Sequence, residues 1–134
     1  MVLRCVLSGS YHRDFETLQR LYRELASNGV QILSPHRLDL IDNQTEFVRD
    51  IAEKNLSVME IERHHLTALY QSDFMWLHCP NGYVGTSAAF EMGVAFSRRI
   101  PIYSNEKPAD NVLAGFVHVV PSVFMAMENI FIIK

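Results

Sequence analysis

Short apolar runs alternate with segments of helical periodicity along this chain, and this alternation constrains the fold more than any other feature. Five runs have strand character, at residues 2–7, 30–33, 74–79, 100–103 and 116–120. Helices are expected between them, at residues 15–27, 45–54, 57–70 and 87–96, and a last helix after residue 120. Ser57 followed by Glu60 is typical of a capping box at the start of the third of these helices. Parallel neighbours need crossover connections, so the pattern predicts a parallel sheet with helices on both faces.

The expected architecture is therefore a doubly wound, three-layer α/β fold of the flavodoxin-like or Rossmann-like type, with five parallel strands. A chain of 134 residues, 49% of them hydrophobic, is long enough for one domain with a core and too short for two. We expect residues 1–134 to form a single domain. Ligands of such sheets bind at the carboxyl ends of the strands.

Charge and composition argue against several classes of protein. The net charge is −3 and Arg98-Arg99 is the only close basic pair, whereas nucleic-acid polymers and membrane surfaces need a concentrated basic patch. No apolar run approaches the roughly 20 residues of a membrane span, and residues 1–8 are too short for a signal peptide, so a cytoplasmic protein is expected. Cys5 and Cys79 fall in predicted strands without metal-ligand spacing, and we interpret them as reduced core residues.

Glu91 is the only charged residue in the predicted helix 87–96. The positions three or four residues away carry small or apolar side chains. Such surroundings raise the pKa of a carboxyl group unless hydrogen-bond donors offset them, which is how carboxylates are tuned for acid, base or nucleophilic chemistry. The alternative is a buried structural glutamate bonded to a neighbouring helix end or a tyrosine.

Three segments are expected at the carboxyl ends of the strands: Gly9-Ser10-Tyr11, residues 80–87, and the polar loop after Leu33. The second contains glycines, two hydroxyls and the free amides of a helix start, which together can hold a phosphate or another anion. Taken alone, this segment is more typical of ordinary helix capping.

Several of these segments resemble one family. They are Gly9-Ser10 after the first strand, residues 66–73 leading into an apolar strand, the stretch GYVGTSAAFEMGVAF at residues 82–96, and Ile100-Pro101-Ile102. The chain resembles, to about Asn129, the nucleoside 2-deoxyribosyltransferases and their 2′-deoxynucleoside 5′-phosphate N-hydrolase relatives. The resemblance assigns Glu91 the role of nucleophile at C1′ of the sugar. Retaining transfer needs such a carboxylate and a second group that handles protons.

At the positions of the group that handles protons, the sequence departs from the family pattern. Relatives usually carry an aspartate eight residues before the acid that opens the third strand, and counting back from Asp73 reaches His65; another family acid corresponds to Gly85. His65 could donate a proton to the departing base, because imidazole ordinarily titrates near neutral pH. Alternatively, His64 and His65 are partly exposed helix residues without a role. Glu62, one turn earlier, is a substitute acid if the register of the match is shifted. Adjacent helical histidines point about 100° apart, which argues against a metal site.

Other roles also follow from the resemblance. Tyr11 matches a tyrosine near the nucleophile, the alternative being a rim aromatic that packs on the sheet. Asp39 lies in a loop that contacts the base in relatives, although solvated loop acids are commoner. The expected substrate-binding residues, including hydroxyls for a 5′-phosphate or the sugar, are Gly9, Ser10, Gly85, Thr86, Ser87 and Asp39.

The sequence thus predicts cleavage or transfer of the N-glycosidic bond of a nucleoside or nucleoside 5′-monophosphate, without a cofactor. Transfer to a base and hydrolysis by water both stay open. The alternative is a catalytically impaired nucleotide-binding or sensing module with the same fold. By resemblance we expect a homo-oligomer, in which the apolar tail at residues 129–133 is a contact if it is not buried within the monomer.

Overall fold

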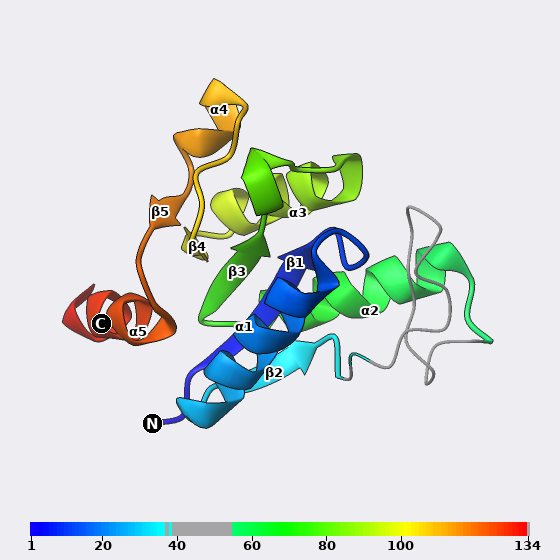
Figure 1. Cartoon of the computed structure of the whole chain (residues 1–134). Coiled ribbons are helices and arrows are strands. Elements are labelled where there is room, and N and C mark those ends of the chain that lie inside the picture. Colours follow the sequence, from blue (N-terminus) through cyan, green and yellow to red (C-terminus); the bar gives the residue numbers. More distant parts are fainter. Residues whose placement is uncertain (37, 39–54, 134) are drawn as a thin grey trace.

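A computed structural model describes residues 1–36, 38 and 55–133, and these contain a five-stranded, all-parallel sheet (Figure 1). The strands are β1 (Arg4–Gly9), β2 (Gln31–Ser34), β3 (Phe74–His78), β4 (Ile102–Ser104) and β5 (His118–Val119). Their spatial order is β2-β1-β3-β4-β5, the flavodoxin-like order. The predicted fold class is confirmed.

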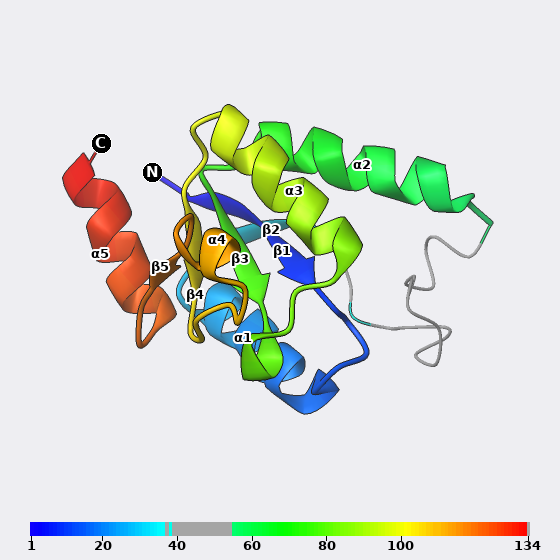
Figure 2. The same ribbon diagram turned by 90° about the horizontal axis from the view of Figure 1, so that it is seen from above.

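Helices cover both faces of the sheet, as Figure 2 shows from above. They are α1 (Phe15–Ser27), α2 (Val58–Tyr70), α3 (Thr86–Ser97), α4 (Asn111–Ala114) and α5 (Val123–Ile133), with a short 3-10 turn, η2 (Pro80–Gly82). The buried side chains of α1 and α5 form one core cluster, and those of α2 and α3 form a second on the opposite face. These three layers were expected from the sequence.

Strand alternation sends neighbouring residues of β1 to different layers. Cys5 and Leu7 belong to the cluster under α1, whereas Val6 belongs to the cluster under α2 and α3. By the same alternation Ser8, which is 1% exposed, faces α2 and α3. A buried hydroxyl therefore lies one residue before the end of this strand, on the side where two helices cover it.

Several local predictions can be compared with the structure. Ser57 and Glu60 form the predicted capping box of α2, with hydrogen bonds of 3.1 Å in each direction. Cys5 and Cys79 are buried and free, and Trp76 is in the core. The capping box and the buried, free state of both cysteines were expected from the sequence and are confirmed.

Two predicted strands were too long, and one predicted helix cannot be compared. β4 starts two residues after its predicted start, and β5 is an exposed pair of residues at the sheet edge rather than a run of five. The predicted helix at residues 45–54 lies outside the described residues. Within the described residues, no helix has the length and apolar character needed to cross a bilayer.

The carboxyl ends of β1 and β3 meet at Gly9, where the strand order reverses. Gly9 pairs with His78 and has a φ of 135°. A Cβ atom there would collide with the backbone carbonyl oxygen of His78. Crevices at such a reversal are the usual ligand sites of open α/β sheets, so Gly9 lets the two strand ends close where a ligand is expected.

Candidate active site

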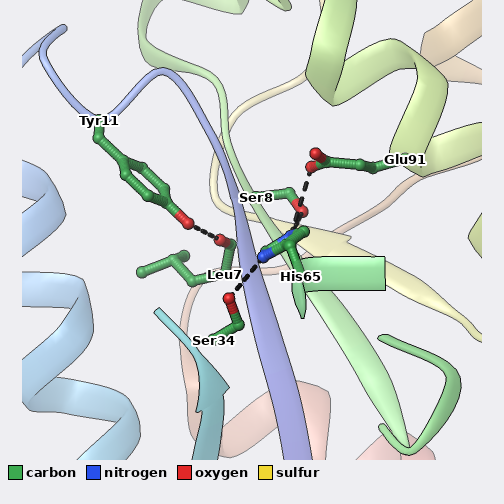
Figure 3. A network of polar contacts seen from close by, with 6 residues as sticks. All are labelled: Leu7, Ser8, Tyr11, Ser34, His65 and Glu91. Atoms are coloured by element: carbon green, nitrogen blue, oxygen red, sulfur yellow. Dashed lines mark hydrogen bonds and ion pairs between the residues drawn. The ribbon is translucent and has the colours of Figure 1, made fainter. Parts of the chain in front are cut away.

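A buried polar cluster joins the carboxyl ends of the strands to α2 and α3 (Figure 3). Glu91 on α3 and His65 on α2 are each 7% exposed. Glu91 Oε1 lies 3.4 Å from His65 Nε2, and the same nitrogen lies 2.9 Å from Ser8 Oγ. Two of the three predicted catalytic residues are thus brought together, and His65 is not the exposed helix residue of the alternative interpretation.

The second ring nitrogen of His65 also has a partner. Ser34, the last residue of β2, places its Oγ 2.7 Å from His65 Nδ1. The ring is therefore held between two serine hydroxyls that come from neighbouring strand ends, with Glu91 on the Ser8 side (Figure 3). Sequence reasoning missed both serines.

Glu62 completes the cluster. It lies three residues before His65 on the same face of α2, is half-buried, and hydrogen-bonds to Glu91. Burial, followed by the hydrogen bond to Glu91 and the negative charge of Glu91, raises the pKa of Glu62 to about 9. Sequence reasoning named Glu62 only as a substitute acid; its spacing from His65 was the available signal.

The pKa of Glu91 moves the other way. Burial alone would raise it, but the charge of His65 and hydrogen bonds from His65, Glu62 and Ser8 outweigh burial and lower it to about 2. Donors therefore offset the apolar surroundings, which was the open condition in the sequence interpretation. At neutral pH the two carboxyl groups share one proton, which stays on Glu62 while Glu91 is ionised.

A pocket of about 180 Å³ opens beside this cluster. Its lining includes every predicted substrate-binding residue within the described part of the chain; the full lining is Gly9, Ser10, Tyr83, Gly85, Thr86, Ser87 and Ala88. Ser87 precedes Glu91 by one helical turn on α3, and the Glu91 side chain itself is not part of the lining. Asp39 lies outside the described residues.

The start of α3 leaves its backbone amides available to this pocket. Gly85 occupies the N-cap position and no side chain caps the helix, while Thr86 and Ser87 are exposed. The hydroxyls of Thr86 and Ser87 therefore do not cap the helix, whereas Gly85 takes the N-cap position, as the capping interpretation of this segment allows. The Arg13 guanidinium lies 3.7 Å from the ring centre of Tyr83, which adds a positive charge near the pocket wall. Such a pocket favours an anion.

Tyr11 has different contacts from those expected of a catalytic tyrosine. Its hydroxyl donates to the Leu7 carbonyl oxygen at 2.7 Å, and its ring packs against the core cluster under α1. Figure 3 shows it across β1 from His65 and Glu91. These contacts match the rim-aromatic alternative, and a catalytic role for Tyr11 stays a prediction.

Within the described residues, no group of three histidine, cysteine or acidic side chains could hold a metal ion. The chain matched no protein-family model and no curated protein. The geometry of the cluster and pocket, rather than a relative, must therefore support any function assigned to this site.

Proposed function

We propose that this protein cleaves or transfers the N-glycosidic bond of a nucleoside or a nucleoside 5′-monophosphate, with Glu91 as the nucleophile and Glu62 as the proton donor. The observation that carries the proposal is the pair of bonded carboxyl groups, one ionised and one protonated, beside the pocket at the ends of β1 and β3. Retaining glycosyl transfer requires two carboxyl groups in these two states.

The reaction proceeds in two displacements. A Glu91 oxygen attacks C1′, the C1′–N bond breaks with its electron pair on the base, and Glu62 gives its proton to the base nitrogen. Water or an acceptor base then attacks C1′, Glu62 takes the proton released, and the ester to Glu91 breaks. Carboxyl groups of retaining glycosidases lie about 5–5.5 Å apart, so we expect Glu62 to turn from Glu91 toward the base when substrate binds.

In this scheme His65 mainly stabilises the negative charge of the Glu91 carboxylate. Its Nε2 lies beside Glu91, where a positive imidazolium or a donated hydrogen bond favours the ionised nucleophile. Donation of a proton to the base, the role that the sequence gave to His65, passes to Glu62 because Glu62 holds a proton at neutral pH. His65 is thus the charge partner of the nucleophile.

The pocket supports a substrate with a sugar or phosphate at its inner end. Its volume of about 180 Å³ is below the roughly 300–1,000 Å³ of pockets that enclose a whole ligand. The amides at the start of α3, with Thr86 and Ser87, suit a 5′-phosphate or sugar hydroxyls. The base would then extend outside this pocket.

Base release, measured by chromatography from a panel of nucleosides and 5′-monophosphates, tests the proposal. Each substrate is incubated with and without an acceptor base, which separates transfer from hydrolysis. Glu91→Gln should abolish release, whereas Glu128→Gln, an exposed glutamate on α5, should not change it. Mass spectrometry should detect a glycosyl adduct on Glu91 in the wild type. Release that persists in Glu91→Gln would overturn the proposed nucleophile.

One observation favours the second candidate, a nucleotide-binding or sensing module without turnover. Glu91 accepts hydrogen bonds from three side chains, and a carboxylate stabilised in this way is a weaker nucleophile. Binding of a 5′-monophosphate without base release, measured by calorimetry beside the turnover assay, would support this candidate against the enzyme.

A homo-oligomer and a cytoplasmic location also stay proposals. Ile130 is buried against the core, but Phe131 and Ile132 are 47% and 79% exposed, so part of the apolar tail is available for contact with a second copy. Free Cys5 and Cys79 are typical of a reducing compartment.

A further inference from the structure

The hydrogen bonds around His65 place a hydrogen on one of its two ring nitrogens, Nε2. An ionised carboxylate only accepts, so the contact between His65 Nε2 and Glu91 Oε1 requires a hydrogen on Nε2. Ser8 also bonds to Glu91, so its hydroxyl hydrogen points to the carboxylate and its oxygen accepts from Nε2. Nδ1 is then the only ring atom left for Ser34.

Ser34 can satisfy Nδ1 in either protonation state of the ring. A serine hydroxyl donates to a bare Nδ1 of neutral histidine and accepts from the Nδ1 hydrogen of an imidazolium. The distance of 2.7 Å between Ser34 Oγ and Nδ1 suits both arrangements. Without this hydroxyl, Nδ1 of a ring that is 7% exposed would lose its partner, and rotation about χ2 would become easier.

We propose that Ser34 is a positioning residue, whose hydroxyl holds the His65 ring so that the Nε2 hydrogen faces Glu91 and Ser8. It comes from β2, whereas Ser8 comes from β1 and Glu91 from α3. The end of an edge strand thereby sets the orientation of the imidazole ring beside the nucleophile. The expected effect of Ser34 on kcat rests on the proposed function. Its expected effect on the orientation of the His65 ring does not.

Nitrogen-15 spectra of the histidine rings test the inference. The chain has six histidines, and His65→Gln identifies the His65 signals by their loss. The wild type should show a single ring state, with hydrogen on Nε2. Ser34→Ala should show a second ring state or broadened signals, and Ser34→Thr, which keeps a hydroxyl, should restore the single state. If Ser34→Ala does not fold, Ser34→Cys is used in its place.

Ser72→Ala is the matched control, because the Ser72 hydroxyl is also partly buried and bonds to the Ala68 carbonyl at the far end of α2. This control should leave the His65 signals unchanged. Base release by Ser34→Ala should show a kcat about fivefold lower at unchanged KM, the size expected for one lost neutral hydrogen bond.

Identical His65 spectra in the wild type and Ser34→Ala would overturn the inference. The spectra need no turnover, so they decide the role of Ser34 even if no nucleoside is cleaved. Conversely, unchanged spectra together with an inactive Glu91→Gln variant would refute only the positioning role and leave the proposed function standing.

Discussion

Replacement of Glu62 by glutamine should stabilise the protein at neutral and mildly alkaline pH. The folded pKa of Glu62 is raised to about 9, against an ordinary value of about 4.3 for glutamate. Between these values the folded protein binds a proton that the unfolded chain lacks, so the free energy of unfolding falls as the pH rises. Glutamine keeps a donor for Glu91 but does not titrate.

The magnitude follows from proton linkage. One proton held only by the folded state changes the free energy of unfolding by at most about 1.4 kcal/mol per pH unit. Glu62 is only half-buried, and solvent screening reduces this to about half. Between about pH 6 and about pH 8, the wild type should lose about 1–1.5 kcal/mol that Glu62→Gln retains. Glu91 does not contribute there, because its lowered pKa affects stability only in acid.

Urea unfolding at a series of pH values measures this difference. Trp76 is the only tryptophan and is 1% exposed, so its fluorescence reports loss of the core. Glu128→Gln, at an exposed position, controls for the loss of one negative charge. Parallel wild-type and Glu62→Gln curves across this range would refute the shared proton. The same variant should lose base release despite its higher stability, as expected where a functional site reduces stability.

Three further variants test other parts of the structure. Gly9→Ala should lower the free energy of unfolding by several kcal/mol in urea, because its Cβ would meet the His78 carbonyl oxygen; wild-type stability would contradict the close approach. Ser87→Ala should lower kcat/KM about fivefold for 5′-monophosphates and leave nucleosides unaffected; equal losses would place the phosphate elsewhere. Ile132→Lys should shift the protein toward monomer in sedimentation, whereas an unchanged oligomer would exclude this end of α5 as the contact.

The fold could be predicted because each of its signals is local. Apolar runs, helix stops and the capping box at Ser57 act over a few residues, and crossover geometry then leaves few topologies. The ends of elements were less predictable. β5 is short because hydrogen bonds to β4 cover only two residues at an exposed edge, which periodicity does not encode.

The candidate site likewise contains residues that could be predicted from the sequence and residues that could not. Glu91 could be found because a lone charge in an apolar helix is visible in the sequence, and Gly85, Thr86 and Ser87 because they precede that helix. Ser34 could not, because only the parallel pairing of β2 with β1 brings it to a histidine 31 residues later. Contacts of this kind depend on three elements at once and leave no local pattern.

The same geometry is compatible with the proposed chemistry although histidine stands at position 65, where the family that the sequence resembles usually has an aspartate. An aspartate in place of His65 would put a third carboxyl group against Glu62 and Glu91, and like charges in contact resist ionisation. With histidine there, Glu91 gains a cation or a donor and can stay ionised, and the proton remains on Glu62. Because positions 62 and 65 lie on one face of α2, Glu62 can serve as the proton donor and Glu91 as the nucleophile of the proposed reaction without an aspartate at position 65.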